Sequence, residues 1–89
     1  MFKFVKNPNV VFEKIDDNFF MYIPQSGKVC IANEVTFDIW DLCDGINRDE
    51  IYQQFINTYD VSCVDENVML QVDTVLKKLL ELSFINTLP

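Results

Sequence analysis

The residue types that most often carry catalysis are scarce in this chain of 89 residues. It has no His, and His is the commonest general base and the commonest metal ligand in proteins. No Ser or Cys can therefore be activated by a neighbouring imidazole. The only glycines, Gly27 and Gly45, stand far apart, so no glycine-rich loop can cradle a phosphate. We expect no metal and no cofactor.

Adjacent carboxylates are the remaining candidates for acid–base chemistry. They stand at Asp16-Asp17, Asp49-Glu50 and Asp65-Glu66. Each pair falls in an expected turn or at the start of an expected helix, where acidic residues are favoured for structural reasons. We interpret them as turn and helix-start residues, and we expect that the protein is not an enzyme.

The three cysteines fit neither a disulfide framework nor a zinc knuckle, because their number is odd and no two have C-x-x-C spacing. We interpret Cys30 and Cys43 as small buried side chains and Cys63 as a loop thiol. No apolar run approaches the ~18 residues that span a bilayer. A reduced, soluble, cytoplasmic protein is the simplest expectation.

The acidic charge balance narrows the class of partner. The formal net charge is −7, from 14 acidic and 7 basic residues. Nucleic-acid binding draws much of its affinity from phosphate neutralisation by Lys and Arg, yet Arg48 is the only Arg and Lys77-Lys78 the longest basic run. We therefore expect neither nucleic acid nor an anionic membrane as partner. A peptide or protein with basic residues fits better.

The first third of the chain has the apolar pattern of β-strands. The expected strands are Val10–Ile15, Phe19–Ile23 and Lys28–Ala32, and turn residues separate them. Short turns between short strands predict an antiparallel meander of three strands. Such a meander needs helices on one of its faces to be stable in water.

Helical spacing begins at Asn33, which can cap a first helix. We expect this helix to end at Asp44-Gly45, with Gly45 as a left-handed C-terminal cap. Asn47 and Glu50 have the spacing of a capping box for a second helix. The predicted fold class is α+β, with three strands followed by three helices in one domain whose ordered core spans about residues 10–85.

The third helix, from Asp65 to about Leu82, is apolar along two lines. The first line is Val68, Val72, Val75, Leu79 and Leu82. The second line is Met69, Leu76 and Leu80, with Asp73 in its gap. One line is enough for packing against a sheet, so the second line either borders a groove or is buried as well. Both interpretations remain open at this stage.

The last expected strand has an unprotected edge. Edge strands expose unpaired backbone groups, which proteins usually protect with charges, prolines or bulges. Lys28 is the only charge near this strand, and residues 29–32 include neither a charge nor a proline. An extended peptide could add here as a fourth strand. The alternative is that a helix, or a second copy of the chain, covers this edge.

Three stretches of the sequence together match a known family pattern. They are the run 24–45 with its Ile39-Trp40 pair and closing Asp44-Gly45, the segment 49–51 with Phe55, and Val72, Val75, Leu76, Leu79 and Ser83-Phe84-Ile85. On these residues, from about Val10 to Ile85, the chain resembles the PqqD-like family, also called RiPP recognition elements. It departs from the family pattern at Ala32 for Leu, Val75 for Phe, Ser83 for Gly, and the shifted Val35-Thr36.

The resemblance implies a winged helix-turn-helix-like fold and a peptide-binding role. Family members bind the leader region of a ribosomally made precursor peptide, antiparallel to the third strand and against the third helix. A partner enzyme, often a radical S-adenosylmethionine enzyme, a cyclase or a leader peptidase, then acts on the remainder. By position, the implied site maps to Lys28, Val29, Cys30, Ile31 and Ala32 on the strand and to Met69, Asp73, Leu76 and Leu80 on the helix.

We therefore predict a peptide chaperone, or adaptor, for a precursor peptide in natural-product biosynthesis. Two alternatives remain. A winged-helix DNA-binding regulator would have only Arg48 and Lys77-Lys78 as its phosphate contacts. A small protein-interaction subunit of another assembly is the second alternative. The open sheet edge could also pair with its own copy in a homodimer.

Overall fold

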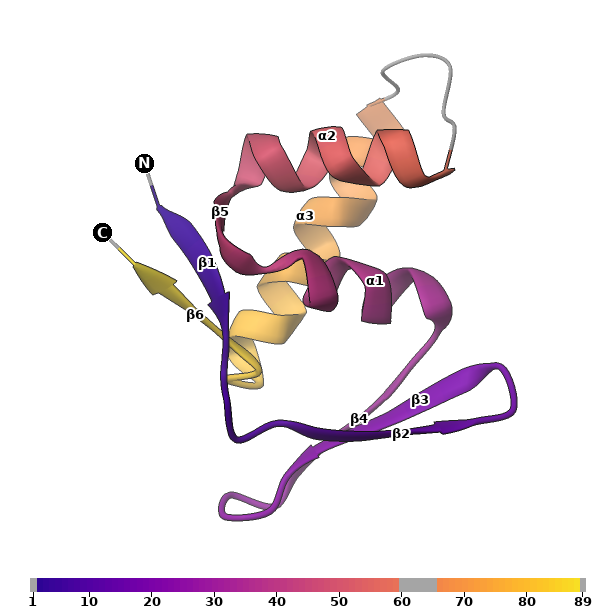
Figure 1. The fold of residues 1–89 in the computed structure, drawn as a ribbon, viewed down its shortest axis with the longest axis vertical. Coiled ribbons are helices and arrows are strands. Elements are labelled where there is room, and N and C mark those ends of the chain that lie inside the picture. Colours follow the sequence, from indigo (N-terminus) through magenta and orange to yellow (C-terminus); the bar gives the residue numbers. More distant parts are fainter. Residues whose placement is uncertain (1, 60–65, 89) are drawn as a thin grey trace.

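Two three-stranded sheets and three helices are seen in a computed structural model that describes residues 2–59 and 66–88. Figure 1 shows their arrangement. In chain order they are β1 (Lys3–Lys6), β2 (Val11–Ile15), β3 (Asn18–Ile23), β4 (Lys28–Ala32), α1 (Glu34–Leu42), β5 (Asp44–Asn47), α2 (Arg48–Tyr59), α3 (Glu66–Glu81) and β6 (Ile85–Leu88).

The sheet β2-β3-β4 is the predicted meander, and each neighbouring pair of strands is antiparallel. The turn between β3 and β4 contains Gly27, whose φ of 71° favours glycine. The turn between β2 and β3 places Asp16 at a φ of 55°, a conformation that Asp tolerates better than most residues. The predicted fold class, an α+β fold with this meander and three helices, is confirmed.

The second sheet, β5-β1-β6, was not predicted. Strand β1 lies in the middle and pairs antiparallel with both β5 and β6. It therefore brings the two ends of the described chain together, as Lys3 pairs with Leu88. These strands have four residues each, and β1 and β6 extend beyond the predicted ordered core of 10–85. Strands this short have too few residues for a clear period-two pattern.

Helix α1 begins as predicted and ends differently. The Asn33 side chain caps it by accepting a hydrogen bond from the Thr36 amide at 2.8 Å. The C-terminal cap, however, is Cys43, whose amide donates to the Trp40 carbonyl at 3.0 Å. Gly45 has a positive φ of 74°, but it lies within β5. The predicted Gly45 cap is therefore wrong, because the chain leaves the helix directly into a strand.

The predicted capping box of α2 is confirmed. The Glu50 amide donates to Asn47 Oδ1 at 2.9 Å, and the Asn47 amide donates to Glu50 Oε1 at 3.2 Å. This reciprocal pair satisfies two backbone donors that a helix start leaves unpaired. The predicted cap of the third helix, Asp65, lies outside the described residues.

Helix α3 ends in a Schellman motif centred on Ser83, whose φ is 61°. The Ser83 amide donates to the Leu80 carbonyl at 3.0 Å, and the Phe84 amide donates to the Leu79 carbonyl at 2.9 Å. Glycine is the usual residue at the left-handed position of this motif. Ser83 therefore occupies a position where the backbone itself favours glycine.

The core lies between the helices and one face of β2-β3-β4. Its fully buried side chains include Met21 from β3, Ile39 from α1, Ile51 from α2 and Leu79 from α3. An aromatic cluster joins α1 to the sheet, since the Phe19 and Phe37 rings stack with centroids 3.9 Å apart. Trp40 Nε1 donates to the Phe84 carbonyl at 3.1 Å. The helices thus cover only the inner face of this sheet.

Candidate functional site

The outer edge of β4 is open in the structure. In the described parts of the chain, β4 pairs with β3 on one side and with no strand on the other. The C-terminal strand β6 pairs with β1 instead. In an antiparallel ladder, alternate residues direct their N–H and C=O groups to opposite sides. Every second residue of β4 therefore presents both groups away from β3, where another extended chain could pair with them.

The side chains of β4 alternate between core and solvent. Cys30 and Ala32 are buried, whereas Val29 is 49% exposed and Ile31 is 71% exposed. The half-buried Lys28 donates from Nζ to Ser83 Oγ at 3.4 Å, which joins the start of β4 to the end of α3. The structure thus places all five predicted strand residues along one open edge, with two apolar side chains exposed.

The predicted residues of α3 do not form one surface. Leu76 is 3% exposed and belongs to the core, while Leu80 is 38% exposed. Met69 is half-buried and packs against the core. Of the second apolar line, Leu76 is therefore buried and Met69 is partly buried, as one of the two interpretations of the sequence expected.

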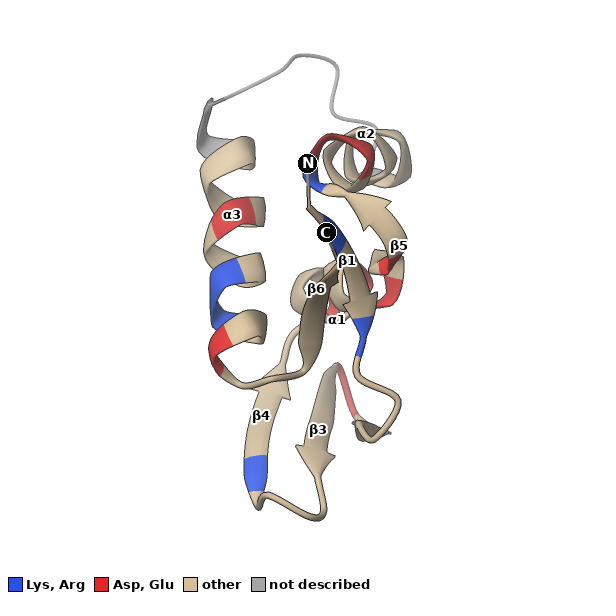
Figure 2. Cartoon of the chain, turned by 90° about the vertical axis from the view of Figure 1, so that its left-hand side faces the viewer, with Lys and Arg blue, Asp and Glu red and all other residues tan. Residues whose placement is uncertain are grey.

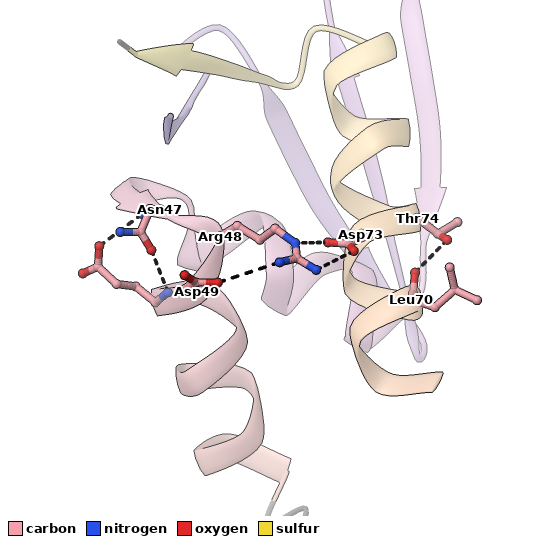
Figure 3. A network of polar contacts seen from close by, with 7 residues as sticks. Asn47, Arg48, Asp49, Leu70, Asp73 and Thr74 are labelled. Carbon is pink, nitrogen blue, oxygen red and sulfur yellow. Dashed lines mark hydrogen bonds and ion pairs between the residues drawn. The ribbon is translucent and has the colours of Figure 1, made fainter. Parts of the chain in front are cut away.

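Asp73 is engaged in a two-pronged ion pair with Arg48, the first residue of α2. Both carboxylate oxygens accept from the guanidinium, and the Nη2–Oδ2 distance is 2.7 Å. The hydrogen bond with Asp73 raises the pKa of the Arg48 guanidinium above its ordinary value. Figure 3 shows Asp73 pointing toward α2, with Leu70 and Thr74 on the other side of α3. This flank of α3 therefore faces α2.

The opposite flank of α3 is apolar and partly covered. Successive helix residues are rotated by about 100°, so Val75 lies nearly opposite Asp73. Val68 and Leu82 fall on the same flank as Val75, and all three are partly buried against the core. Figure 2 shows α3 and β4 on the same side of the molecule. The sequence pattern placed Val68, Val75 and Leu82 in the line that packs into the core, because the pattern alone does not determine how the helix is rotated about its axis.

Both cysteines in the described ranges are buried. Burial raises the pKa of the Cys43 thiol to about 12, and its Sγ donates to the Ile39 carbonyl at 3.3 Å. Cys30 is buried as predicted, whereas Cys63 lies outside the described residues. Within residues 2–59 and 66–88, no group of three or more potential ligands is placed to hold a metal.

Two further findings bear on the partner. No helix in the described ranges is long and apolar enough to cross a membrane. Arg48, one of three basic residues considered for phosphate contact, is already paired with Asp73. The DNA-binding alternative therefore has only Lys77 and Lys78 left, and a phosphate footprint of two lysines is too small for appreciable affinity.

The described residues form a small α+β domain with an open sheet edge at β4. The family model for coenzyme PQQ synthesis protein D (PqqD) matches residues 19–85. The chain belongs to this family. Among solved structures, it is similar to TbiB1 in complex with the TbiA(beta) leader peptide, with a TM-score of 0.70 and 22% identity over 92% of this chain and 94% of that one. No curated protein matches the chain.

Proposed function

We propose that the chain binds the leader region of a ribosomally synthesised precursor peptide and presents it to a modifying enzyme. The open edge of β4 is the observation that carries this proposal, because it offers unpaired backbone groups beside exposed apolar side chains. Membership of the PqqD family and the likeness to a protein solved with a leader peptide support it.

The leader would add to β4 as a fourth, antiparallel strand. Backbone hydrogen bonds would supply affinity without regard to sequence, and side-chain pockets would supply selectivity. Val29 and Ile31 stand beside the added strand on the outer face, and their exposure leaves them free to pack against its side chains. Residues 29–32 include no charge or proline that would oppose the pairing.

The leader would also contact α3, on the flank that holds Val75 and Leu82. This flank lies opposite the Asp73–Arg48 ion pair and is only partly buried. We therefore replace the helix residues inferred from the sequence by this flank. Leu76 lies too deep to touch a peptide, and the Asp73 carboxylate is already occupied.

Chemistry on the peptide would belong to the partner enzyme. We propose that the chain is a non-catalytic adaptor that raises the local concentration of its substrate near that enzyme. The partner would be a radical S-adenosylmethionine enzyme, a cyclase or a leader peptidase. Buried, unpaired Cys30 and Cys43 fit a reducing cytoplasm. The net charge of −7 favours leaders that contain basic residues.

Fluorescence-polarisation titration with the leader peptides encoded beside the gene tests the proposal. We expect one of them to bind saturably, and a scrambled peptide of the same composition to bind much more weakly. Substitution Ile31→Asp should weaken binding while the circular-dichroism spectrum stays unchanged, since Ile31 is largely exposed. Equal binding of leader and scrambled peptide would exclude sequence-selective leader recognition.

A further inference from the structure

The outer face of the β2-β3-β4 sheet is apolar, and the helices lie on its opposite side. Residues directly opposite each other on paired strands point to the same face. The register therefore sets two rows on the outer face: Val11, Tyr22 and Val29, then Glu13, Phe20 and Ile31. Ile15 extends this face and is 55% exposed, while Val11 is 41% exposed. An exposed apolar patch of this kind often marks an interaction site.

A pocket of about 210 Å³ lies at one end of this face. Its lining residues are Ile15, Asp16, Asn18, Phe20 and Ile31. An apolar cavity of about 150 Å³ can hold a benzene ring. The pocket can therefore accept one aromatic or branched aliphatic side chain, which would contact strands β2, β3 and β4 together.

The charges at this face are all negative. Glu13 lies in the second row, and Asp16 lines the pocket. The nearest lysines face the other way: Lys14 Nζ lies 5.8 Å from the centroid of the inner Phe19 ring, and Lys28 donates to Ser83. The complementary ligand is therefore a large apolar side chain with a Lys or Arg beside it.

A second copy of the chain fits this face poorly. Two copies packed face to face would bring their Glu13 and Asp16 carboxylates together, and each copy has a net charge of −7. The two rows and Ile15 also amount to far fewer residues than the roughly 20–30 that each side of a standard interface contributes. A short segment of a different protein matches both the size and the charge.

We propose that this outer face is a second docking surface, which binds a partner-protein segment with a large apolar side chain next to a Lys or Arg. The surface extends from Val29 and Ile31 on β4 to Glu13 and Ile15 on β2, two strands away from the open edge. It meets the leader site only at Val29 and Ile31. A leader added to β4 would extend the same face with its own side chains. A partner docked here would then contact the adaptor and its bound leader at once.

Selection from a random peptide library displayed on phage tests this inference directly. Clones are first selected for binding to the wild-type chain. Clones that also bind the Ile15→Ser variant are then discarded, because they bind elsewhere on the surface. We expect the surviving peptides to share an aromatic or branched residue next to Lys or Arg. A synthetic copy of the best peptide should bind Ile15→Ser about tenfold more weakly than wild type, the change expected for one buried apolar side chain.

Two matched variants locate the contact. Glu13→Lys should weaken binding of the selected peptide, because it reverses the charge that faces the basic residue of the peptide. Leu70→Ser on α3, where Leu70 is 65% exposed, should leave its affinity unchanged. Saturating leader peptide should not abolish binding of the selected peptide, because the two sites meet only at Val29 and Ile31. The same variants should bind the leader as wild type does, so failure of this inference is distinct from failure of leader binding.

Three results would overturn the inference. The first is that every clone that binds the wild-type chain also binds the Ile15→Ser variant. The second is that the leader excludes every selected peptide and Glu13→Lys leaves their affinity unchanged, which would place them at the edge of β4. The third is a wild-type dimer in analytical ultracentrifugation that Ile15→Ser dissociates, since the face would then be occupied by a second copy.

Discussion

Lys28, at the start of β4, donates a hydrogen bond to the side chain of Ser83, just beyond the end of α3. This contact links the candidate binding strand to the segment that follows the neighbouring helix. Ser83 also holds the left-handed position that closes α3, and its carbonyl accepts from Asn7 Nδ2 at 2.8 Å. One residue thus links the helix end, the binding strand and the segment after β1.

Replacing Ser83 with Gly should stabilise the protein by about 0.5–1 kcal/mol, because glycine adopts the positive φ without a Cβ clash. The hydrogen bond from Lys28 would be lost, but a contact of this kind at a partly exposed site contributes little. Urea unfolding measures the change. Ser83→Ala is the matched control, and it should be no more stable than wild type, since it loses the hydroxyl and keeps the strain.

Proline at two successive positions of β4 should separate folding from peptide binding. Cys30 and Ile31 direct their amides to opposite sides of the strand. One proline variant therefore loses a hydrogen bond to β3 and should unfold, while the other loses an outward donor and should stay folded. Circular dichroism identifies the folded variant, which should bind the leader at least about tenfold more weakly.

An Ile31→Ala variant controls for loss of the side chain in that comparison. It should stay folded and keep more leader affinity than a folded proline variant at the same position. If the folded proline variant binds the leader as tightly as wild type, the strand-addition site is not on β4.

Leader affinity should be sensitive to the flank of α3 that holds Val75. Val75→Ser should weaken leader binding about five- to tenfold through lost apolar contact, whereas Leu80→Ser, on the other flank, should change it little. Leu76→Asp should unfold the protein, because Leu76 is 3% exposed and a buried unpaired charge is very costly. Equal losses from Val75→Ser and Leu80→Ser would contradict the assignment of the flank.

The ion pair between Arg48 and Asp73 should contribute modestly to stability. Both side chains are more than a third exposed, so solvent screens the interaction. Asp73→Asn should therefore lower the free energy of unfolding by about 0.3–1 kcal/mol, less at high salt. Asp49→Asn is the control, since its 3.8 Å contact with Arg48 is long and exposed, and it should lower the free energy of unfolding less than Asp73→Asn does. Thermal unfolding at low and high salt distinguishes them.

Stability should fall at high pH because of Cys43. Burial raises its pKa from 9.0 to about 12 in the folded protein. Between these values the unfolded thiol loses its proton and the folded thiol keeps it, so the free energy of unfolding decreases with pH, by at most about 1.4 kcal/mol per unit. Urea unfolding of wild type and Cys43→Ala from pH 8 upward tests this. Parallel pH curves would show that Cys43 does not titrate in this range.

The sequence predicted the features that local patterns determine. Turn residues and alternation located β2, β3 and β4, and capping residues located the starts of α1 and α2. The sheet formed by β1, β5 and β6 escaped prediction, because its strands are short and pair only with strands far away in the sequence. The rotation of α3 also escaped, since two apolar lines fit the core equally well until the Arg48–Asp73 contact orients the helix.

The register of β1 against β6 has a practical consequence for engineering. Lys3 stands opposite Leu88, so both ends of the described chain emerge at one point (Figure 1). A fluorescent reporter or an enzyme fused to either end would be attached at nearly the same place on the domain. Moving the fusion from one end to the other should therefore change the distance between the fused protein and the candidate binding strand very little.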